Sequence, residues 1–148
     1  MINVVPMENT PGNFEFSLAV KKEAFGPHIV KRWGWDEQHQ RETHSERWAA
    51  RRFFQIVLDG DSIGTVSLDE SPSHVTLSDF YILSPFHRRG IGTEVLAKIL
   101  SEASARGLPV RLQRLKWNPA FSLYKRHGFV VTGETDTHFQ MERASRDS

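Results

Sequence analysis

Apolar residues recur with a helical period in one long segment of the chain. Between Gly90 and Ala105 they stand at Ile91, Val95 and Ile99, four positions apart, and further apolar residues flank them. This spacing places the apolar side chains on one face and predicts an amphipathic helix. A glycine and a proline follow within a few positions, which predicts that the helix ends there.

Three segments in the middle of the chain are rich in β-branched and aromatic residues and predict strands at 52–58, 62–68 and 75–83. Asp-Gly-Asp at 59–61 predicts a tight hairpin between the first two of these strands. Ser-Pro-Ser at 71–73 predicts a second turn, before the third strand.

The N-terminal third predicts a short strand followed by helices. Residues 2–6 fit an edge strand, and Thr-Pro-Gly-Asn at 10–13 predicts a turn. Residues 14–25 carry apolar side chains at helical spacing, and Gly-Pro at 26–27 is expected to break this helix and begin a new helical piece. A polar helix capped by its first Asp is expected over 36–47.

The C-terminal third predicts one more short helix between strands. A strand is expected over 110–115, the helix over 119–127, and closing strands over 129–133 and 138–143. Helices and strands thus alternate in the second half of the chain, whereas the centre is a meander of strands. This order predicts an α/β domain with a mixed sheet.

The composition is that of one ordinary globular domain. The chain has 148 residues, of which 39% are hydrophobic and 25% charged, so a single domain over 1–148 is expected, with a short segment at 1–13 and a disordered tail at 144–148. The absence of cysteine excludes disulfides, thiolate metal sites and a cysteine nucleophile, and it favours a cytoplasmic location. Neither a secretory signal nor an apolar run of roughly 20 residues is present, so no membrane partner is expected.

Charge narrows the range of partners. The net charge of +1 gives no reason to expect a nucleic-acid partner. Residues 88–127 nevertheless carry an excess of seven positive charges. This field could attract a polyanionic small ligand, or the charges could lie on solvated faces. His39 and His44 are five positions apart, not the four that place two ligands on one helical face, so no metal site is expected.

The sharpest local motif is the turn Pro85–Thr93, which joins the third predicted strand to the long helix. The first N–H groups of a helix have no partner within it and carry partial positive charge. Gly90 and Gly92 allow a ligand to approach the backbone, and Arg88 and Arg89 add charge at the same place. These features predict a phosphate-binding site, although a turn without a ligand can carry the same glycines.

Two common phosphate motifs do not fit this turn. A dinucleotide fingerprint needs a third glycine where Val95 stands. A nucleotide P-loop needs Lys followed by Ser or Thr, which the segment lacks. A general nucleotide-phosphate binder is therefore disfavoured.

Three segments resemble motifs of the GNAT acetyltransferases. Residues 87–92, His-Arg-Arg-Gly-Ile-Gly, resemble the Gln/Arg-x-x-Gly-x-Gly/Ala turn that wraps the coenzyme A pyrophosphate in this family, with His87 in place of Gln or Arg. Residues 118–129 are similar to the family's Asn-x-Ala-x-x-Leu-Tyr-x-x-x-Gly-Phe segment. Residues 33–40 are similar to a Trp-Gly-Trp-Asp-Glu element of a bacterial branch. The resemblance runs from about Phe14 to Arg143.

The resemblance implies a single-domain GNAT-like fold, with a mixed, mostly antiparallel central sheet flanked by helices on both faces. It implies an N-acetyltransferase that moves the acetyl group of acetyl-CoA, its co-substrate, directly onto a primary amine. The acceptor would be a small molecule or a peptide, the protein a monomer or a homodimer, and no metal would take part. The cofactor-binding residues implied by the resemblance are Phe80, Tyr81, Ile82, Arg88, Arg89, Gly90, Ile91, Gly92, Thr93 and Asn118.

The resemblance also implies a general acid. Tyr124 is expected to give a proton to the departing thiolate, and a core tyrosine is the alternative reading of this residue. The positions near Thr76 and Gln113, where some family members place a glutamate as general base, hold residues that cannot serve. The remaining candidates for the base are Asp36, Glu37, Asp79 and ordered water.

The acceptor site is predicted from one further group. Trp33, Trp35 and Glu37 are expected to bind the substrate, because tryptophan attracts an ammonium group through its ring face. A hydrophobic corner that packs the early helices on the sheet is the alternative for the two tryptophans. The alternative function is a catalytically weak or inactive GNAT-like acyl-CoA-binding or sensor module. The missing base and His87 favour this alternative, whereas the glycines of the turn, Asn118 and Tyr124 disfavour it.

Overall fold

The computed structural model describes residues 1–34, 36–116 and 121–145, without the side chains of 25–33 and 121. Seven strands form a mixed sheet in the order β1-β2-β3-β4-β5-β7-β6, which confirms the predicted α/β class. The strands are β1 (Ile2–Pro6), β2 (Arg52–Leu58), β3 (Asp61–Glu70), β4 (Val75–Ile82), β5 (Val110–Leu115), β6 (Val130–Glu134) and β7 (His138–Arg143). The helices are α1 (Pro11–Trp33), α2 (Glu37–Ala50), α3 (Ile91–Ala105), α4 (Phe121–Arg126) and a 3₁₀ turn, η1 (Ser84–Phe86).

Contacts along the chain define two compact units. The first comprises Met1–Ser67 and Asp79–Ile91, and the second comprises Leu68–Ser78 and Gly92–Ser148. The division passes through β3 and β4. Among the described helices, none is both long and apolar enough to cross a membrane.

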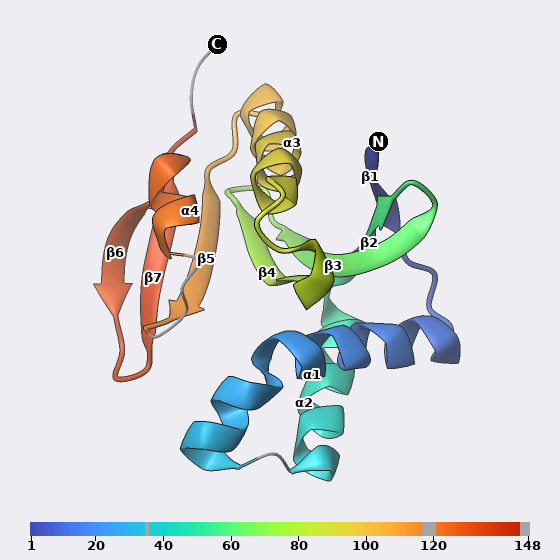
Figure 1. Cartoon of the computed structure of the whole chain (residues 1–148). Helices are drawn as coiled ribbons and strands as arrows, with labels where there is room; N and C mark the ends of the chain where they lie inside the picture. Colours follow the sequence, from blue (N-terminus) through green and yellow to red (C-terminus); the bar gives the residue numbers. More distant parts are fainter. Residues whose placement is uncertain (35, 117–120, 146–148) are drawn as a thin grey trace. The chain divides into compact units, whose positions relative to one another are not determined.

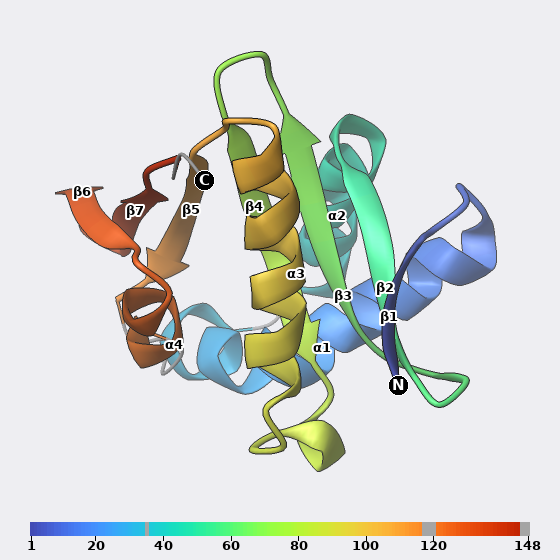
Figure 2. The same cartoon turned by 90° about the horizontal axis from the view of Figure 1, so that it is seen from above.

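The first unit begins with an antiparallel pair of strands. β1 pairs with β2 from Ile2 opposite Leu58 onward, and Figure 2 shows β1, β2 and β3 side by side. Asp59 and Gly60 have φ angles of 49° and 91°, and two successive positive φ angles are typical of a type I′ hairpin turn. The hairpin predicted at 59–61 is therefore confirmed.

Helix α1 begins earlier and ends later than the sequence predicted. Thr10 accepts a hydrogen bond from the N–H of Asn13 (3.1 Å), and Pro11 takes the first helical position, where its missing N–H is not needed. The turn predicted at 10–13 is therefore wrong. The break predicted at 26–27 is also wrong, since α1 continues to Trp33. A proline in a helix removes one backbone hydrogen bond, and the rest of this long helix offsets that loss.

Helix α2 lies beside α1 in the first unit (Figure 1). Its N-cap is Asp36, whose carboxylate accepts from the N–H of His39 (3.1 Å), as predicted. The helix continues three residues beyond the predicted end at Arg47. The aromatic rings of Phe14, His44, Trp48 and Phe53 contact one another at centroid distances from 5.0 to 6.0 Å, so α1 and α2 pack on β2.

The second unit contains the C-terminal strands. β4 and β5 are parallel, with Val75 opposite Val110, and β7 pairs antiparallel with both β5 and β6. The predicted apolar face of α3 is confirmed, because Val95, Leu96, Ile99, Leu100 and Ala103 are each at most 6% exposed. Strand β6 is mostly exposed, and its Val130 is 62% exposed.

Candidate active site

In the first unit, the second half of β4 carries three of the residues predicted to bind the cofactor. Phe80, Tyr81 and Ile82 lie between a left-handed residue, Asp79, and the η1 turn. Strand β3 approaches them closely at Gly64. A Cβ added to Gly64 would overlap the carbonyl oxygen of Tyr81 and lie 3.1 Å from the Cα of Ile82. A glycine on β3 therefore allows this close approach.

Asp79 is the most constrained residue of β4. Its φ angle is +48°, a conformation that is uncommon outside glycine, and its side chain is 1% exposed. Arg47 Nη1 lies 3.0 Å from Oδ1, and Arg51 Nη1 lies 3.4 Å from Oδ2. Ser67 Oγ donates to Oδ2 (2.8 Å), and Thr65 Oγ1 donates to the backbone carbonyl of Asp79 (3.2 Å).

These contacts decide the role that the sequence left open for Asp79. Both carboxylate oxygens are engaged by arginines or a hydroxyl, and the group is buried. The carboxylate is therefore not available to take a proton from an amine.

Next to Asp79, α1 and α2 contribute buried polar side chains. Ser17 and His44 are each 1% exposed, and Lys21 is 5% exposed. Burial lowers the pKa of His44 to about 4, against the opposing charge of Asp79. Burial also lowers the pKa of Lys21, and the charge of Arg47 acts in the same direction.

The Ser17–His44 pair is not a nucleophile and its base. Ser17 Oγ donates to the carbonyl of Phe14 (2.8 Å), so its single proton is used there and His44 Nε2, at 2.6 Å, donates to Oγ. The buried Nδ1 of His44 has no hydrogen-bond partner in the described part of the chain, so no carboxylate orients the ring. In a catalytic triad the serine hydroxyl donates to the histidine, and a carboxylate accepts from the other ring nitrogen.

The glycine turn follows β4 in the same unit. Its first part, η1, is fixed by Glu23 of α1, which accepts hydrogen bonds from the N–H (3.1 Å) and the hydroxyl of Ser84. The ring of His87 donates to the carbonyl of Ile82 and so ties the turn back to the end of β4. His87 therefore stabilises the turn itself, a role that the family motif does not assign to this position.

Two residues of the turn have left-handed backbones. Arg88 has a φ angle of +63° and Gly90 one of +76°, and α3 begins at the next residue, Ile91. A Cβ on Gly90 would meet nothing within 4 Å, so the backbone angle and not space requires glycine there. The guanidinium of Arg89 lies 5.4 Å from the ring centroid of Phe86. The turn thus presents the free N–H groups of a helix start together with two arginines.

In the second unit, Tyr124 lies on α4 and is 6% exposed. Its ring contacts Phe129 edge to face, with centroids 5.7 Å apart. Burial raises the pKa of Tyr124 to about 12, and the nearby charge of Arg114 acts in the opposite direction. Arg114, on β5, is itself 6% exposed and donates to the carbonyls of Leu115 (3.0 Å) and Lys116 (3.4 Å). Tyr124 therefore stays protonated at neutral pH.

The remaining predicted residues are only partly described. Asn118 and Trp35 lie outside the described residues, and so does the side chain of Trp33 at the end of α1. Glu37 is half exposed and forms ion pairs with Lys22 (3.3 Å) and Arg41 (3.9 Å). Gly92 and Thr93 lie in the first turn of α3, as the motif predicts.

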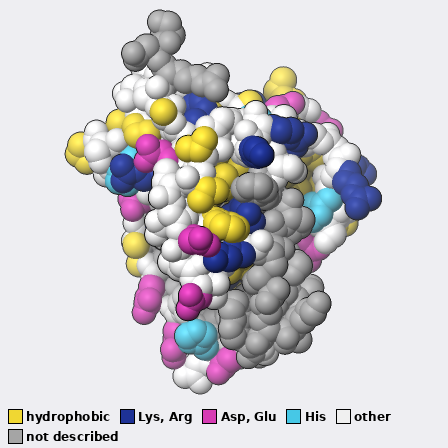
Figure 3. Space-filling model, turned by 90° about the vertical axis from the view of Figure 1, so that its left-hand side faces the viewer, with side chains coloured by type: hydrophobic (Ala, Val, Ile, Leu, Met, Phe, Trp, Pro, Cys, Tyr) yellow, Lys and Arg dark blue, Asp and Glu magenta, His cyan; other side chains and the backbone are white. Residues whose placement is uncertain are grey.

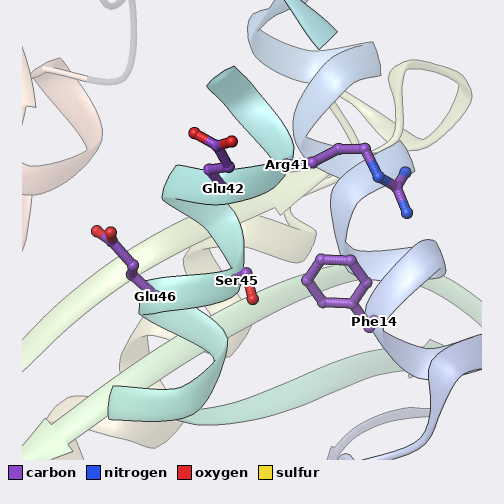
Figure 4. A pocket seen from close by; sticks show the side chains of 5 residues that line it. All are labelled: Phe14, Arg41, Glu42, Ser45 and Glu46. Atoms are coloured by element: carbon purple, nitrogen blue, oxygen red, sulfur yellow. The ribbon is translucent and has the colours of Figure 1, made fainter. Parts of the chain in front are cut away.

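A separate pocket lies between α1 and α2 (Figure 4). It has a volume of about 460 Å³ and is lined by Phe14, Arg41, Glu42, Ser45 and Glu46. None of these residues belongs to the predicted site.

No group of three or more His, Asp or Glu suited to a metal ion occurs within residues 1–34, 36–116 and 121–145. The face seen in Figure 3 mixes apolar and basic side chains with acidic ones.

The family model described as "Acetyltransferase (GNAT) family" matches residues 18–129. The chain belongs to this family. The resemblance and the acyltransferase class predicted from the sequence are thereby confirmed. A search of curated protein sequences gives no match.

Solved GNAT structures share the fold. The PaiA N-acetyltransferase from Thermoplasma acidophilum, in complex with coenzyme A, matches with a TM-score of 0.77 and 19% identity over 97% of this chain and 99% of its own. The ribosomal-protein-S18-alanine N-acetyltransferase from Escherichia coli matches with a TM-score of 0.75 and 17% identity, over 100% of this chain and 96% of that protein. A GNAT acetyltransferase from Elizabethkingia anophelis with acetyl-CoA bound matches with a TM-score of 0.71 and 12% identity, over 97% of each chain.

Sequence reasoning missed the buried polar residues beside Asp79. Their spacing held a signal, because Ser17 and Lys21 are four positions apart on α1, and the buried His44 is three positions from Arg47 on α2. Such spacings place side chains on one helical face. Polar residues on the face that also carries apolar residues indicate a buried polar cluster.

Proposed function

We propose that this GNAT protein transfers the acetyl group of acetyl-CoA directly to a primary amine. The observation that carries the proposal is the turn between β4 and α3. Its left-handed Arg88 and Gly90 lead into the unpaired N–H groups at the start of a helix, next to Arg89. This arrangement suits a pyrophosphate, because both the helix terminus and the guanidinium groups favour negative charge.

The cofactor is proposed to extend from this turn along β4. The residues assigned to the pyrophosphate are Arg88, Arg89, Gly90, Ile91, Gly92 and Thr93. The backbone of Phe80, Tyr81 and Ile82 is assigned to the pantetheine arm and the acetyl carbonyl, and Asn118 to the arm or to nearby backbone. A backbone N–H aimed at the carbonyl oxygen stabilises the charge that develops there, by a factor of about 100 in rate or more.

The reaction is proposed to proceed without an acyl-enzyme. The amine nitrogen attacks the acetyl carbonyl carbon, a C–N bond forms, the C–S bond breaks, and the thiolate of coenzyme A leaves with the bonding electron pair. The Ser17–His44 pair supports this route, because its hydroxyl proton is committed to a carbonyl and its ring has no carboxylate partner.

Tyr124 is proposed to stabilise the departing thiolate of coenzyme A. With a pKa of about 12 it holds its proton at neutral pH and can donate a hydrogen bond to a thiolate. The positive charge of Arg114 makes the phenol a stronger acid than burial alone would. The proton leaving the amine goes to ordered water in this scheme, because Asp79 is enclosed by its partners and Asp36 caps α2.

The acceptor is proposed to be a primary amine on a small molecule or a peptide. Trp33, Trp35 and Glu37 stay the residues proposed to bind it.

The test is turnover of acetyl-CoA with a panel of primary amines. Release of free thiol is followed continuously, and the acetylated amine is identified by mass spectrometry. Turnover that needs both protein and amine supports the proposal. Binding of acetyl-CoA without turnover of any amine would contradict it and favour a non-catalytic acyl-CoA-binding module.

A further inference from the structure

The conformation of Asp79 is unusual for its position. A φ angle of +48° interrupts the extended backbone inside β4, and the residue is neither glycine nor exposed. Up to Asp79, buried and half-buried residues alternate along β4, whereas Phe80, Tyr81 and Ile82 are all half-buried. The left-handed residue therefore coincides with the point where the regular strand pattern ends. A conformation of this kind persists only where surrounding contacts stabilise it.

The contacts that hold Asp79 come from the C-terminal end of α2 and from β3. Arg47, on α2, and Arg51, the C-cap residue that follows it, reach the carboxylate at 3.0 and 3.4 Å. Ser67 and Thr65 hold its carboxylate and its backbone carbonyl from β3, at 2.8 and 3.2 Å. The side chain and the main chain are thus both fixed, which leaves the peptide between Asp79 and the next residue little freedom to rotate.

We infer that Asp79 is a positioning residue: its carboxylate, bound by Arg47, Arg51 and Ser67, fixes the left-handed turn in β4 and so orients the backbone groups of Phe80–Ile82 toward the pantetheine arm and the thioester. This inference rests on the proposed function, which assigns those backbone groups to acetyl-CoA. Asp79 takes no part in proton transfer. Its effect is exerted through the main chain that follows it.

The charges around Asp79 indicate why an aspartate and not a glycine stands here. Glycine adopts a positive φ more easily, but it adopts many other conformations as well. Aspartate tolerates the left-handed region and adds a charge that two arginines and a hydroxyl can hold. The carboxylate therefore selects one conformation of β4 from those that a glycine would allow.

The test compares two ligands of the same protein. Acetyl-CoA contacts both the glycine turn and β4 under the proposal, whereas adenosine 3′,5′-bisphosphate, the nucleotide part of coenzyme A, reaches only the turn. Dissociation constants for both ligands are measured by calorimetry for the wild type, Asp79→Ala, Asp79→Gly and Asp79→Asn. Ile56→Ala serves as the matched control, because Ile56 is fully buried in the same unit on β2, away from β4.

Asp79→Ala and Asp79→Gly should weaken acetyl-CoA binding about tenfold, which corresponds to about 1.4 kcal/mol, and leave the bisphosphate unchanged. Asp79→Asn keeps a hydrogen-bonding side chain that tolerates a positive φ but loses the charge that the two arginines hold, so it should weaken acetyl-CoA binding by less than Asp79→Ala does. Ile56→Ala should lower the melting temperature and leave the ratio of the two affinities unchanged. If Asp79→Ala does not fold, Ser67→Ala should show the same selective loss to a smaller degree.

The outcomes separate the two proposals. A wild type that binds neither ligand contradicts the proposed function, and the positioning role falls with it. A wild type that binds both, with Asp79 variants that retain the wild-type affinity for acetyl-CoA, overturns the positioning role alone. Equal weakening of both ligands, or the same selective loss in Ile56→Ala, also overturns it, because either result would reflect general loss of structure.

Discussion

The side chains of Ser17 on α1 and His44 on α2 meet in the interior of the first unit, with Ser17 Oγ 2.6 Å from His44 Nε2. Both residues are 1% exposed, and the hydroxyl proton of Ser17 goes to the carbonyl of Phe14. The imidazole therefore donates from Nε2, and burial lowers its pKa to about 4, so the ring is neutral at pH 7. This hydrogen bond joins the two helices that pack beside β2.

The neutral state of His44 predicts a pH dependence of stability. Its pKa of about 4 in the folded protein lies below the ordinary value of 6.5, so between these pH values the unfolded chain binds a proton that the folded protein excludes. Stability from this source is fully present above pH 6.5 and is lost as the pH falls toward 4, by about 3 kcal/mol in all.

Substitution of His44 by Gln tests this dependence. Glutamine can still donate to Ser17 but does not titrate, so His44→Gln should flatten the fall in the free energy of unfolding between pH 6.5 and 4. Urea unfolding at several pH values measures it. An equally steep fall in the variant would show that other groups cause the dependence.

The contact between Gly64 and Tyr81 predicts a selective effect on cofactor binding. Gly64→Ala adds a methyl group that overlaps the carbonyl of Tyr81, so the second half of β4 must shift. We expect a loss of about 1–3 kcal/mol in the free energy of unfolding and weaker binding of acetyl-CoA. Gly12→Ala is the control, since a Cβ there meets nothing within 4 Å, and it should leave acetyl-CoA affinity unchanged. Equal affinities in the two variants would place acetyl-CoA away from this part of β4.

Gly90 and Gly107 offer a matched pair for testing the phosphate site. Both have a positive φ angle, +76° and +69°, and at both an added Cβ meets nothing within 4 Å. Alanine should therefore cost about 1–2 kcal/mol of stability at either position. Only Gly90→Ala should also weaken acetyl-CoA binding, because only Gly90 lies in the turn between β4 and α3. Similar affinities in the two variants would contradict the phosphate site.

Tyr124 can be tested by removing its hydroxyl. Tyr124→Phe keeps the ring contact with Phe129 but removes the proton that is proposed to serve the thiolate. General acid catalysis contributes about 10²–10⁴-fold, so kcat should fall by about 100-fold or more while acetyl-CoA affinity stays close to that of the wild type. Phe129→Leu, which alters the same contact without removing a proton, is the control. An unchanged kcat in Tyr124→Phe would make Tyr124 a core residue only.

The sequence predicted the elements whose pattern is local and repeated. The apolar period from Val95 to Ala103 placed α3, and Asp-Gly at 59–60 placed the hairpin, because each signal arises within one element or one turn. The glycine turn was found for the same reason. The helix break predicted at Gly26-Pro27 was wrong, because the helical segments on both sides stabilise α1 by more than these two residues destabilise it.

The environment of Asp79 could not be predicted in the same way. Its left-handed backbone depends on Arg47 and Arg51, about 30 positions earlier in the chain, and on Ser67 of the neighbouring strand. Nothing in the residues adjacent to Asp79 indicates these partners. The register of β3 against β4, and the approach of α2, decide them.

The central claim is that the turn between β4 and α3 binds the pyrophosphate of acetyl-CoA, and thermal unfolding tests it most directly. The wild type is heated with and without acetyl-CoA, with ATP at the same concentration as a control for nonspecific anion binding. At 100 times the dissociation constant, acetyl-CoA should add about 2.7 kcal/mol of stability. That gain should raise the melting temperature by about 5 °C or more, and ATP should raise it less. No shift at millimolar acetyl-CoA, or an equal shift with ATP, would contradict the claim.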